Sequence, residues 1–337
     1  MGLTTTELGR TGMEITRVGF GAWAVGGGGV NFGWGSQDDE DSIRAIRHAV
    51  DVGVNWVDTA AVYGHGHSEQ VVGRAVRGIA EADRPFVFTK CGLNWDDDDP
   101  MGPHPRDLRP GEIRRGAEDS LRRLGLERID LLQFHWPDAG GPEIENSWAE
   151  MGRLIDEGKV RAGGVSNFDV PLLERAEAVR PVASLQPPFS LIRRGAAGDV
   201  IPWCHQHHVG IIVYSPMQSG LLSGRFSAER VASLPADDWR RANAEFQSPA
   251  LGRNLALASG LRPISARHRV SMAEVAIAWT LSWPGVTGAI VGARSPEQVD
   301  GWIGAAALTL TADDLAEIAV AVESSEAGGG PSRPPLD

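Results

Sequence analysis

Short apolar segments alternate with longer amphipathic segments along most of this chain. The expected strands are residues 17–20, 54–58, 86–90, 129–134, 161–165, 182–186, 210–214 and 288–291. The expected helices are residues 38–52, 68–78, 111–124, 143–157, 169–180, 199–208, 272–282 and 296–305. Strands that alternate with helices are typical of parallel βα units. Eight such units predict a (β/α)8 barrel, the TIM-barrel fold.

Two additions to the barrel are expected within one domain that covers residues 1–325. Residues 6–16 are typical of a β-hairpin with a glycine-containing turn, which would close the N-terminal end of the barrel. Residues 314–325 predict an extra C-terminal helix. The segment 326–337 is rich in Gly, Pro and Ser, so we expect it to be disordered.

Charge and cysteine content exclude several kinds of partner. The net charge of −12 disfavours nucleic acid and anionic membranes. The chain has only Cys91 and Cys204, which cannot form a disulfide framework and fit a reducing compartment. Its N-terminus lacks an apolar core like that of a signal peptide, and no apolar run approaches membrane-spanning length. We therefore expect a cytoplasmic protein without a membrane segment.

Two further patterns could suggest a cofactor or metal site and are rejected. Residues 19–24, "GFGAWA", match the dinucleotide pattern G-x-G-x-x-A, but the glycines at 26–29 would not open the helix that a Rossmann fold needs. Histidines cluster at 65 and 67 and at 205, 207 and 208, without cysteines or acids at zinc-binding spacing. No metal is expected.

Four polar residues follow or end the expected strands. Asp58 and Tyr63 lie in "NWVDTAAVYG", Lys90 ends "RPFVFTK", and His135 follows "RIDLLQF". The C-terminal ends of barrel strands carry the active site in TIM-barrel enzymes. We therefore expect an acid, a phenol, an amine and an imidazole to meet at one mouth of the barrel.

These four groups suit the reduction of a carbonyl. A carbonyl that accepts hydride needs a proton on its oxygen, and Tyr63 can supply it if Lys90 lowers the pKa of the phenol. Asp58 would balance the charge of Lys90, and His135 would hold the substrate oxygen. Two alternatives are a buried Asp58–Lys90 ion pair that only closes the barrel, and a lyase or isomerase that uses Lys90 as a Schiff-base amine.

The chain resembles the aldo-keto reductase family over nearly its whole length, and its local pattern is similar to bacterial members associated with sugar or inositol metabolism. The matching stretches are 8–23, 58–76, 120–137, 158–168, 214–226 and 291–299. The resemblance implies that Asp58, Tyr63, Lys90 and His135 form a catalytic tetrad with Tyr63 as proton donor. It also implies NADP(H), with NAD(H) as the alternative, bound across the barrel mouth, and reversible reduction of a small aldehyde or ketone.

The resemblance also assigns cofactor contacts. Nicotinamide would lie against Tyr214, Arg294 would bind the 2′-phosphate, and the backbone after Tyr214 would wrap the pyrophosphate. The full set of cofactor residues is Gly21, Ala22, Trp23, Ser166, Asn167, Gln186, Tyr214, Ser215, Pro216, Met217, Gln218, Gly220, Leu222, Gly292, Arg294 and Gln298. Trp302 stands where the family often has an asparagine that contacts adenine, which puts the cofactor preference in doubt.

The substrate is less well defined by the sequence. Trp23, Trp34, Trp95 and Trp136 follow strand ends and are expected to line the pocket, where sugars and aryl aldehydes would both stack. The long loops 91–110 and 215–253 should cover the mouth, but the sequence leaves open whether they close on the cofactor. It also leaves the oligomeric state open. A redox-sensing regulatory subunit with slow turnover is the alternative function.

Overall fold

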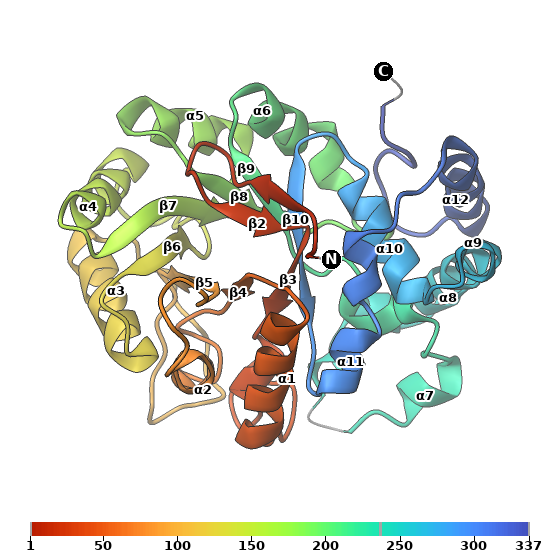
Figure 1. Cartoon of the computed structure of the whole chain (residues 1–337), viewed down its shortest axis with the longest axis horizontal. Coiled ribbons are helices and arrows are strands. Elements are labelled where there is room, and N and C mark those ends of the chain that lie inside the picture. Colours follow the sequence, from red (N-terminus) through yellow and green to blue (C-terminus); the bar gives the residue numbers. More distant parts are fainter. Residues whose placement is uncertain (1, 236–237, 336–337) are drawn as a thin grey trace.

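A closed barrel of parallel strands forms the centre of the molecule (Figure 1). The computed structural model describes residues 2–235 and 238–335; residue 1, residues 236–237 of the second long loop and residues 336–337 of the tail lie outside it. The strands run around the barrel in the order β10-β3-β4-β5-β6-β7-β8-β9. Their bounds are β3 Val18–Gly21, β4 Trp56–Asp58, β5 Phe86–Cys91, β6 Ile129–Phe134, β7 Val160–Ser166, β8 Ser184–Gln186, β9 Gly210–Val213 and β10 Val286–Gly292. The predicted (β/α)8 barrel is confirmed.

Helices cover the outside of this barrel. Those expected from the sequence are α1 Asp39–Asp51, α2 His67–Val76, α3 Pro110–Leu124, α4 Ile144–Asp156, α5 Val170–Val179, α6 Val200–Gln206, α10 Met272–Leu281, α11 Pro296–Asp300 and α12 Ala312–Ser325. Side-chain caps fix several starts: Asp38 caps α1, and capping boxes begin α10 at Ser271 and α12 at Thr311. The expected helix 296–305 is shorter, because α11 ends at Asp300 and a separate 3-10 turn, η6 Ile303–Ala306, follows.

The segment between β9 and α10 contains structure that the sequence did not predict. It holds η3 Gln218–Ser223, α7 Ala228–Ala232, η4 Trp239–Ala242, η5 Ala244–Phe246, α8 Ala250–Gly260 and α9 Arg262–His268. Glycines at 252 and 260 and the proline at 263 weaken the helical signal of this stretch. Burial of Leu257 and Ile264 in the outer core stabilises α8 and α9. The remaining turns are η1 Ala24–Gly26 and η2 Gly195–Gly198.

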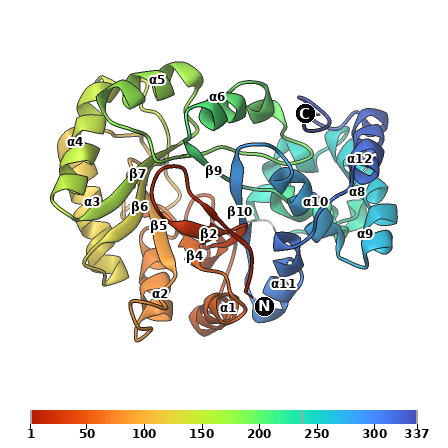
Figure 2. The same cartoon turned by 45° about the horizontal axis from the view of Figure 1, so that its top comes forward.

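An N-terminal hairpin closes the end of the barrel opposite the strand C-termini, as expected. It consists of β1 Thr5–Glu7 and β2 Glu14–Thr16, which lie across the barrel opening in Figures 1 and 2. Leu8, Met13 and Ile15 are fully buried. They share an apolar cluster with side chains from the barrel interior: Trp56, Phe88, Leu131, Ala162, Ile212 and Ile290.

Trp56 fills the barrel interior because a neighbouring strand lacks a side chain there. A Cβ atom at Gly19 would lie 2.1 Å from Cε2 of Trp56. The indole Nε1 donates to the carbonyl of Thr16, at 2.8 Å, so the ring cannot turn away without losing a hydrogen bond. The hairpin, β3 and β4 are therefore fitted to one another around this ring.

Gly19→Ala should destabilise the protein by about 3 kcal/mol, because the new methyl group overlaps a fully buried ring. Urea unfolding of the wild type and the variant measures the difference. Gly111→Ala is the matched control, since no atom lies within 4 Å of its added Cβ, and it should unfold like the wild type or slightly later. Equal stability of Gly19→Ala and the wild type would contradict this packing.

The C-terminal segment is held in place where the sequence predicted disorder. Arg194 donates from its guanidinium to the carbonyls of Ala327, at 3.0 Å, and Gly330, at 3.1 Å. Its backbone N–H donates to the carbonyl of Gly329 at 3.1 Å, and Ala327 is buried. The partner that orders residues 326–335 is distant in sequence, so the composition of the segment could not reveal it. No described helix is long and apolar enough to cross a membrane.

Candidate active site

The barrel brings Asp58, Tyr63, Lys90 and His135 to one end. Asp58 is the last residue of β4, Lys90 lies near the end of β5, and His135 directly follows β6. In the parallel register, Asp58 pairs with Phe88, and Lys90 pairs with Gln133 on β6. Tyr63 lies in the turn between β4 and α2, and its Oη lies 3.4 Å from Nζ of Lys90. The four predicted residues therefore come together at the C-terminal mouth.

Lys90 is the centre of this group. Its Nζ lies 2.5 Å from Oδ1 of Asp58, 2.9 Å from the carbonyl of Thr59 and 3.4 Å from Oη of Tyr63. The side chain of Lys90 is completely buried. All three donors of the ammonium are thus used, one of them on the phenol.

Two glutamines complete the surroundings of Asp58. Its Oδ2 accepts from Nε2 of Gln133, at 3.2 Å, and from Nε2 of Gln186, at 3.0 Å. Gln186 also donates to Oε1 of Gln133 at 3.0 Å. Gln133 was not singled out in the sequence, although a polar residue inside the apolar run "DLLQF" is a usable signal. Because Nε2 of Gln186 is engaged by Asp58 and Gln133, a contact between Gln186 and nicotinamide would fall to its Oε1.

His135 lies on the other side of the phenol. The rings of Tyr63 and His135 meet edge to face, with centroids 5.7 Å apart. The carbonyl of His135 accepts from Nδ2 of Asn167 at 3.0 Å. This places an imidazole and a phenol side by side, as two groups that can contact the same oxygen atom.

Burial and charge set the protonation of the tetrad. Burial raises the pKa of Tyr63 and outweighs the opposing effect of Lys90, so the lowered value expected from the sequence is not found. Burial would lower the pKa of Lys90, but Asp58 and Tyr63 together raise it. Burial, and then the charge of Lys90, hold the pKa of His135 well below its usual value. At neutral pH the site therefore holds a neutral phenol, an ammonium and a neutral imidazole.

Three of the predicted cofactor residues form one hydrogen-bonded chain beside the tetrad. Ser166 donates from Oγ to the carbonyl of Gln186, at 2.8 Å. Asn167 donates from Nδ2 to Oγ of Ser166, at 2.9 Å, and accepts at Oδ1 from Oη of Tyr214, at 2.9 Å. Asn167 has a left-handed backbone, with φ of 62°. The side chains that the resemblance assigns to nicotinamide are thus held in place by one another.

The segment after β9 has an irregular backbone. Ser215, Gln218 and Ser219 all have positive φ, and Gly220 lies at 95°. The side chain of Gln218 is buried: Ser190 donates to its Oε1 at 3.0 Å, and its Nε2 donates to Glu245. Pro216, Met217 and Leu222 belong to the same turn, and Leu222 is completely buried. A cofactor would therefore meet mainly backbone here.

Arg294 follows β10, next to the exposed Gly292. Its backbone N–H donates to Oε1 of Gln298 at 2.9 Å. Its guanidinium donates to Oε1 of Gln37, at 2.5 Å, and to the carbonyl of Ser36. These are neutral oxygens, and among residues 2–235 and 238–335 no carboxylate lies within ion-pair distance of Arg294.

The four predicted pocket tryptophans divide into two groups. Trp23 lies parallel to Tyr63, with ring centroids 6.1 Å apart, and meets Trp34 edge to face at 5.2 Å. Trp95 instead stacks on His65 at 5.1 Å, and Trp136 lies under the guanidinium of Arg106 at 4.9 Å.

Just before Trp23, Gly21 ends β3, and the N–H of Ala22 donates to the carbonyl of Asp58 at 2.8 Å.

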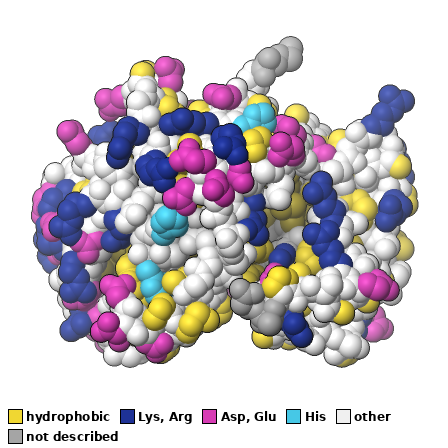
Figure 3. Space-filling model, turned by 90° about the horizontal axis from the view of Figure 1, so that it is seen from below, with side chains coloured by type: hydrophobic (Ala, Val, Ile, Leu, Met, Phe, Trp, Pro, Cys, Tyr) yellow, Lys and Arg dark blue, Asp and Glu magenta, His cyan; other side chains and the backbone are white. Residues whose placement is uncertain are grey.

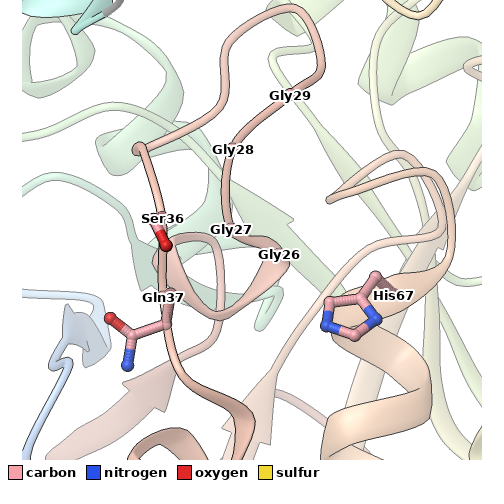
Figure 4. A pocket seen from close by; sticks show the side chains of 7 residues that line it. All are labelled: Gly26, Gly27, Gly28, Gly29, Ser36, Gln37 and His67. Carbon is pink, nitrogen blue, oxygen red and sulfur yellow. The ribbon is translucent and has the colours of Figure 1, made fainter.

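The glycine-rich loop that follows Trp23 packs directly on the tyrosine turn. A Cβ atom at Gly26 would lie 2.8 Å from the backbone N of Gly64, next to Tyr63. A pocket of about 430 Å³ opens along this loop (Figure 4). It is lined by Gly26, Gly27, Gly28, Gly29, Ser36, Gln37 and His67.

Among residues 2–235 and 238–335, no three His, Cys, Asp or Glu side chains form a set that could hold a metal ion.

Sequence reasoning also missed Trp239. It lies on η4 in the long loop after β9, and its ring stacks on Trp23 with centroids 5.5 Å apart. Its distance from any strand end hid it from a search based on strand C-termini. Trp239 shows that this loop reaches over the mouth of the barrel.

Comparison with known proteins agrees with this geometry. The model of the aldo/keto reductase family matches residues 17–323. Aldo-keto reductase YhdN of Bacillus subtilis is 34% identical over 321 residues, covering 95% of this chain and 94% of that protein. The NADH-specific methylglyoxal reductase of Escherichia coli is 31% identical over 330 residues, covering 94% of this chain and 98% of that protein.

Solved structures give the same result. The glycerol dehydrogenase AKR11B4 of Gluconobacter oxydans superposes with a TM-score of 0.87 at 34% identity, over 100% of this chain and 98% of that one. An aldo/keto reductase of Klebsiella pneumoniae, in complex with NADP and acetate, has a TM-score of 0.71 at 25% identity, over 94% of each chain. The chain therefore belongs to the aldo-keto reductase family and is an NAD(P)H-dependent oxidoreductase that acts on carbonyl and alcohol groups.

Proposed function

We propose that this enzyme reduces a small aldehyde or ketone with NADPH, and that Tyr63 is the proton donor. The observation that carries the proposal is the buried contact of Lys90 with both Asp58 and Tyr63. NADPH, when bound, supplies a hydride to the carbonyl carbon. Negative charge then develops on the substrate oxygen, where a positioned acid has its largest effect.

The four side chains of the tetrad would neutralise and stabilise this charge. Tyr63 gives its proton to the substrate oxygen, and the ammonium of Lys90 stabilises the phenolate left behind. Asp58, held by Gln133 and Gln186, keeps Lys90 charged. Neutral His135 donates a hydrogen bond to the same substrate oxygen. Because the wall formed by Trp23 and its neighbours is apolar, this chemistry would occur away from bulk water.

Several features fit a nicotinamide cofactor. The fixed chain of Ser166, Asn167 and Tyr214 offers polar groups beside the tetrad. The irregular backbone after Tyr214 presents peptide groups rather than side chains, which suits the predicted contact with pyrophosphate. The guanidinium of Arg294 has neutral partners, so a phosphate could replace them with a favourable exchange of charge.

Arg294 should favour NADPH over NADH. Relatives differ in this respect, since one is described as NADH-specific and another structure contains NADP. Arg294→Ala should weaken NADPH binding about tenfold to a hundredfold and NADH binding less than about threefold, because only NADPH carries the 2′-phosphate. Titration of tryptophan fluorescence with both cofactors measures this. An equal loss for both would show that Arg294 does not bind the phosphate.

The reaction itself is tested by incubating the purified protein with NADPH and short aldehydes and following reduced-nicotinamide absorbance. Steady oxidation that depends on the aldehyde supports the proposal. Tight NADPH binding without turnover on a broad aldehyde and ketone panel would instead favour the regulatory alternative. No binding of either cofactor would contradict both.

The partner expected here is a small molecule. Acidic and basic side chains are intermixed on the face shown in Figure 3, and the net charge is −12. Such a surface does not favour nucleic acid. We place the reaction in the cytoplasm, because Cys91 and Cys204 are free, buried thiols of a kind that suits a reducing compartment.

A further inference from the structure

Three tryptophans cover one side of the catalytic tyrosine. Trp23, Trp34 and Trp239 are here called the tryptophan cluster. Trp34 and Trp239 meet edge to face at 5.6 Å, and each also contacts Trp23, which lies against Tyr63. The three come from different segments: the end of β3, the glycine-rich loop and the long loop after β9. A substrate at Tyr63 must contact this cluster.

Two members of the cluster carry hydrogen-bond donors without acceptors. Nε1 of Trp34 and Nε1 of Trp239 are shielded from solvent, and no atom in the described part of the chain accepts from either. A buried indole N–H normally has a partner, because leaving it unpaired costs free energy. Among the described residues, Trp279, Trp283 and Trp302 also have a buried Nε1 without an acceptor, but only Trp34 and Trp239 belong to the cluster that contains Trp23, the tryptophan that lies against Tyr63. An acceptor brought by a ligand would relieve both.

A second pair of polar side chains, His65 and His104, lies beside Trp95. His65 and His104 face each other with their Nε2 atoms 3.1 Å apart, so that one ring donates and the other accepts. Burial lowers the pKa of both, so the pair is neutral at neutral pH. No residue among 2–235 and 238–335 bonds to either Nδ1, and both histidines are partly exposed. One Nδ1 therefore carries a hydrogen and the other a lone pair.

This arrangement distinguishes between two kinds of carbonyl compound. An aryl aldehyde would use the aromatic faces but would offer no acceptors beyond its carbonyl, which Tyr63 and His135 already engage. A hydroxylated carbonyl compound presents C–H faces to the rings and hydroxyl oxygens to the indole donors. Only the second kind supplies acceptors for the unpaired Nε1 donors of Trp34 and Trp239.

Resting on the carbonyl reduction proposed above, we propose that Trp34 and Trp239 determine specificity by donating hydrogen bonds from Nε1 to hydroxyl oxygens of a small hydroxyaldehyde or hydroxyketone. Trp23 packs against its carbon chain. Because both Nε1 atoms are shielded from solvent in the present arrangement, the indole rings of Trp34 and Trp239 must turn for these donors to reach the substrate.

The test compares glyceraldehyde with propionaldehyde, which have equal carbon chains and differ in hydroxyl groups. Trp239→Phe and Trp34→Phe each keep an aromatic face and remove the N–H. Each should lower kcat/KM for glyceraldehyde about fivefold to tenfold and for propionaldehyde less than about twofold. Ratios of variant to wild type cancel the hydration of each aldehyde in water. Unchanged discrimination in both variants would overturn the proposal.

Trp283→Phe is the matched control. Its Nε1 is also buried without an acceptor, but Trp283 packs against Phe189 and Trp279 rather than in the cluster, so both rates should stay unchanged. NADPH dissociation constants separate the two sources of an acceptor oxygen. Weaker NADPH binding with equal losses for both aldehydes would place the acceptor on the cofactor and overturn the proposal. If the wild type reduces no carbonyl compound, the proposed function itself fails.

Discussion

Tyr63→Phe should lower the rate of carbonyl reduction by about a hundredfold to ten-thousandfold, the usual contribution of a positioned general acid. The substrate oxygen would receive charge with no proton at hand, since Lys90 lies behind the ring and His135 can only donate a hydrogen bond. NADPH binding should change less than about twofold, because phenylalanine keeps the ring that packs against Trp23 and His135. Single-turnover oxidation of bound NADPH measures the chemical step.

The control is the only other tyrosine in the chain, Tyr214. Its hydroxyl donates to Asn167, and burial raises its pKa to about 12. Tyr214→Phe should reduce the rate less than about tenfold, since it loses a positioning hydrogen bond and no acid. If Tyr63→Phe kept full activity, the assignment of the proton donor would be wrong.

Lys90→Met should abolish reduction and also destabilise the fold by about 3–5 kcal/mol, because it leaves the buried carboxylate of Asp58 without its countercharge. Lys90 and Asp58 are both at least 97% buried, as their side chains expose 0% and 3%. Urea unfolding measures stability, and aldehyde-dependent NADPH oxidation measures activity.

The double variant Lys90→Met with Asp58→Asn separates the two effects. It removes both charges, so it should regain most of the stability and none of the activity. If Lys90→Met had the same free energy of unfolding as the wild type, the ion pair would contribute less to stability than its burial indicates. Activity retained in either variant would remove Lys90 from the reaction.

The barrel and the positions of the tetrad were readable from the sequence because both depend on local patterns. Apolar runs mark buried strands, and Asp58, Lys90 and His135 stand at or near the ends of three of them. Tyr63 followed from the chemistry that a carbonyl needs. The structure confirms the barrel and brings the four residues together, while their catalytic roles stay predictions.

Features that depend on distant partners were not readable. The polar Gln133 stands out inside the apolar run of β6, but its partner Asp58, on another strand, could not be read from that run. Trp239 reaches the mouth from the long loop after β9, and the local sequence does not predict where this loop lies. Arg194 orders a Gly- and Pro-rich tail more than a hundred residues away. The pKa of Tyr63 was also misjudged, because the sequence shows the neighbouring Lys90 but not the burial that outweighs it.

Hydride transfer from the nicotinamide to a carbonyl carbon at Tyr63 can be followed with NADPH that carries deuterium in the transferable position at C4. The substrate is glyceraldehyde, and the alcohol formed is analysed by mass spectrometry. We expect each product molecule to gain a deuterium at the former carbonyl carbon with the wild type, and product to be nearly absent with Tyr63→Phe. Alcohol formed without deuterium, or formed equally well by Tyr63→Phe, would contradict this mechanism.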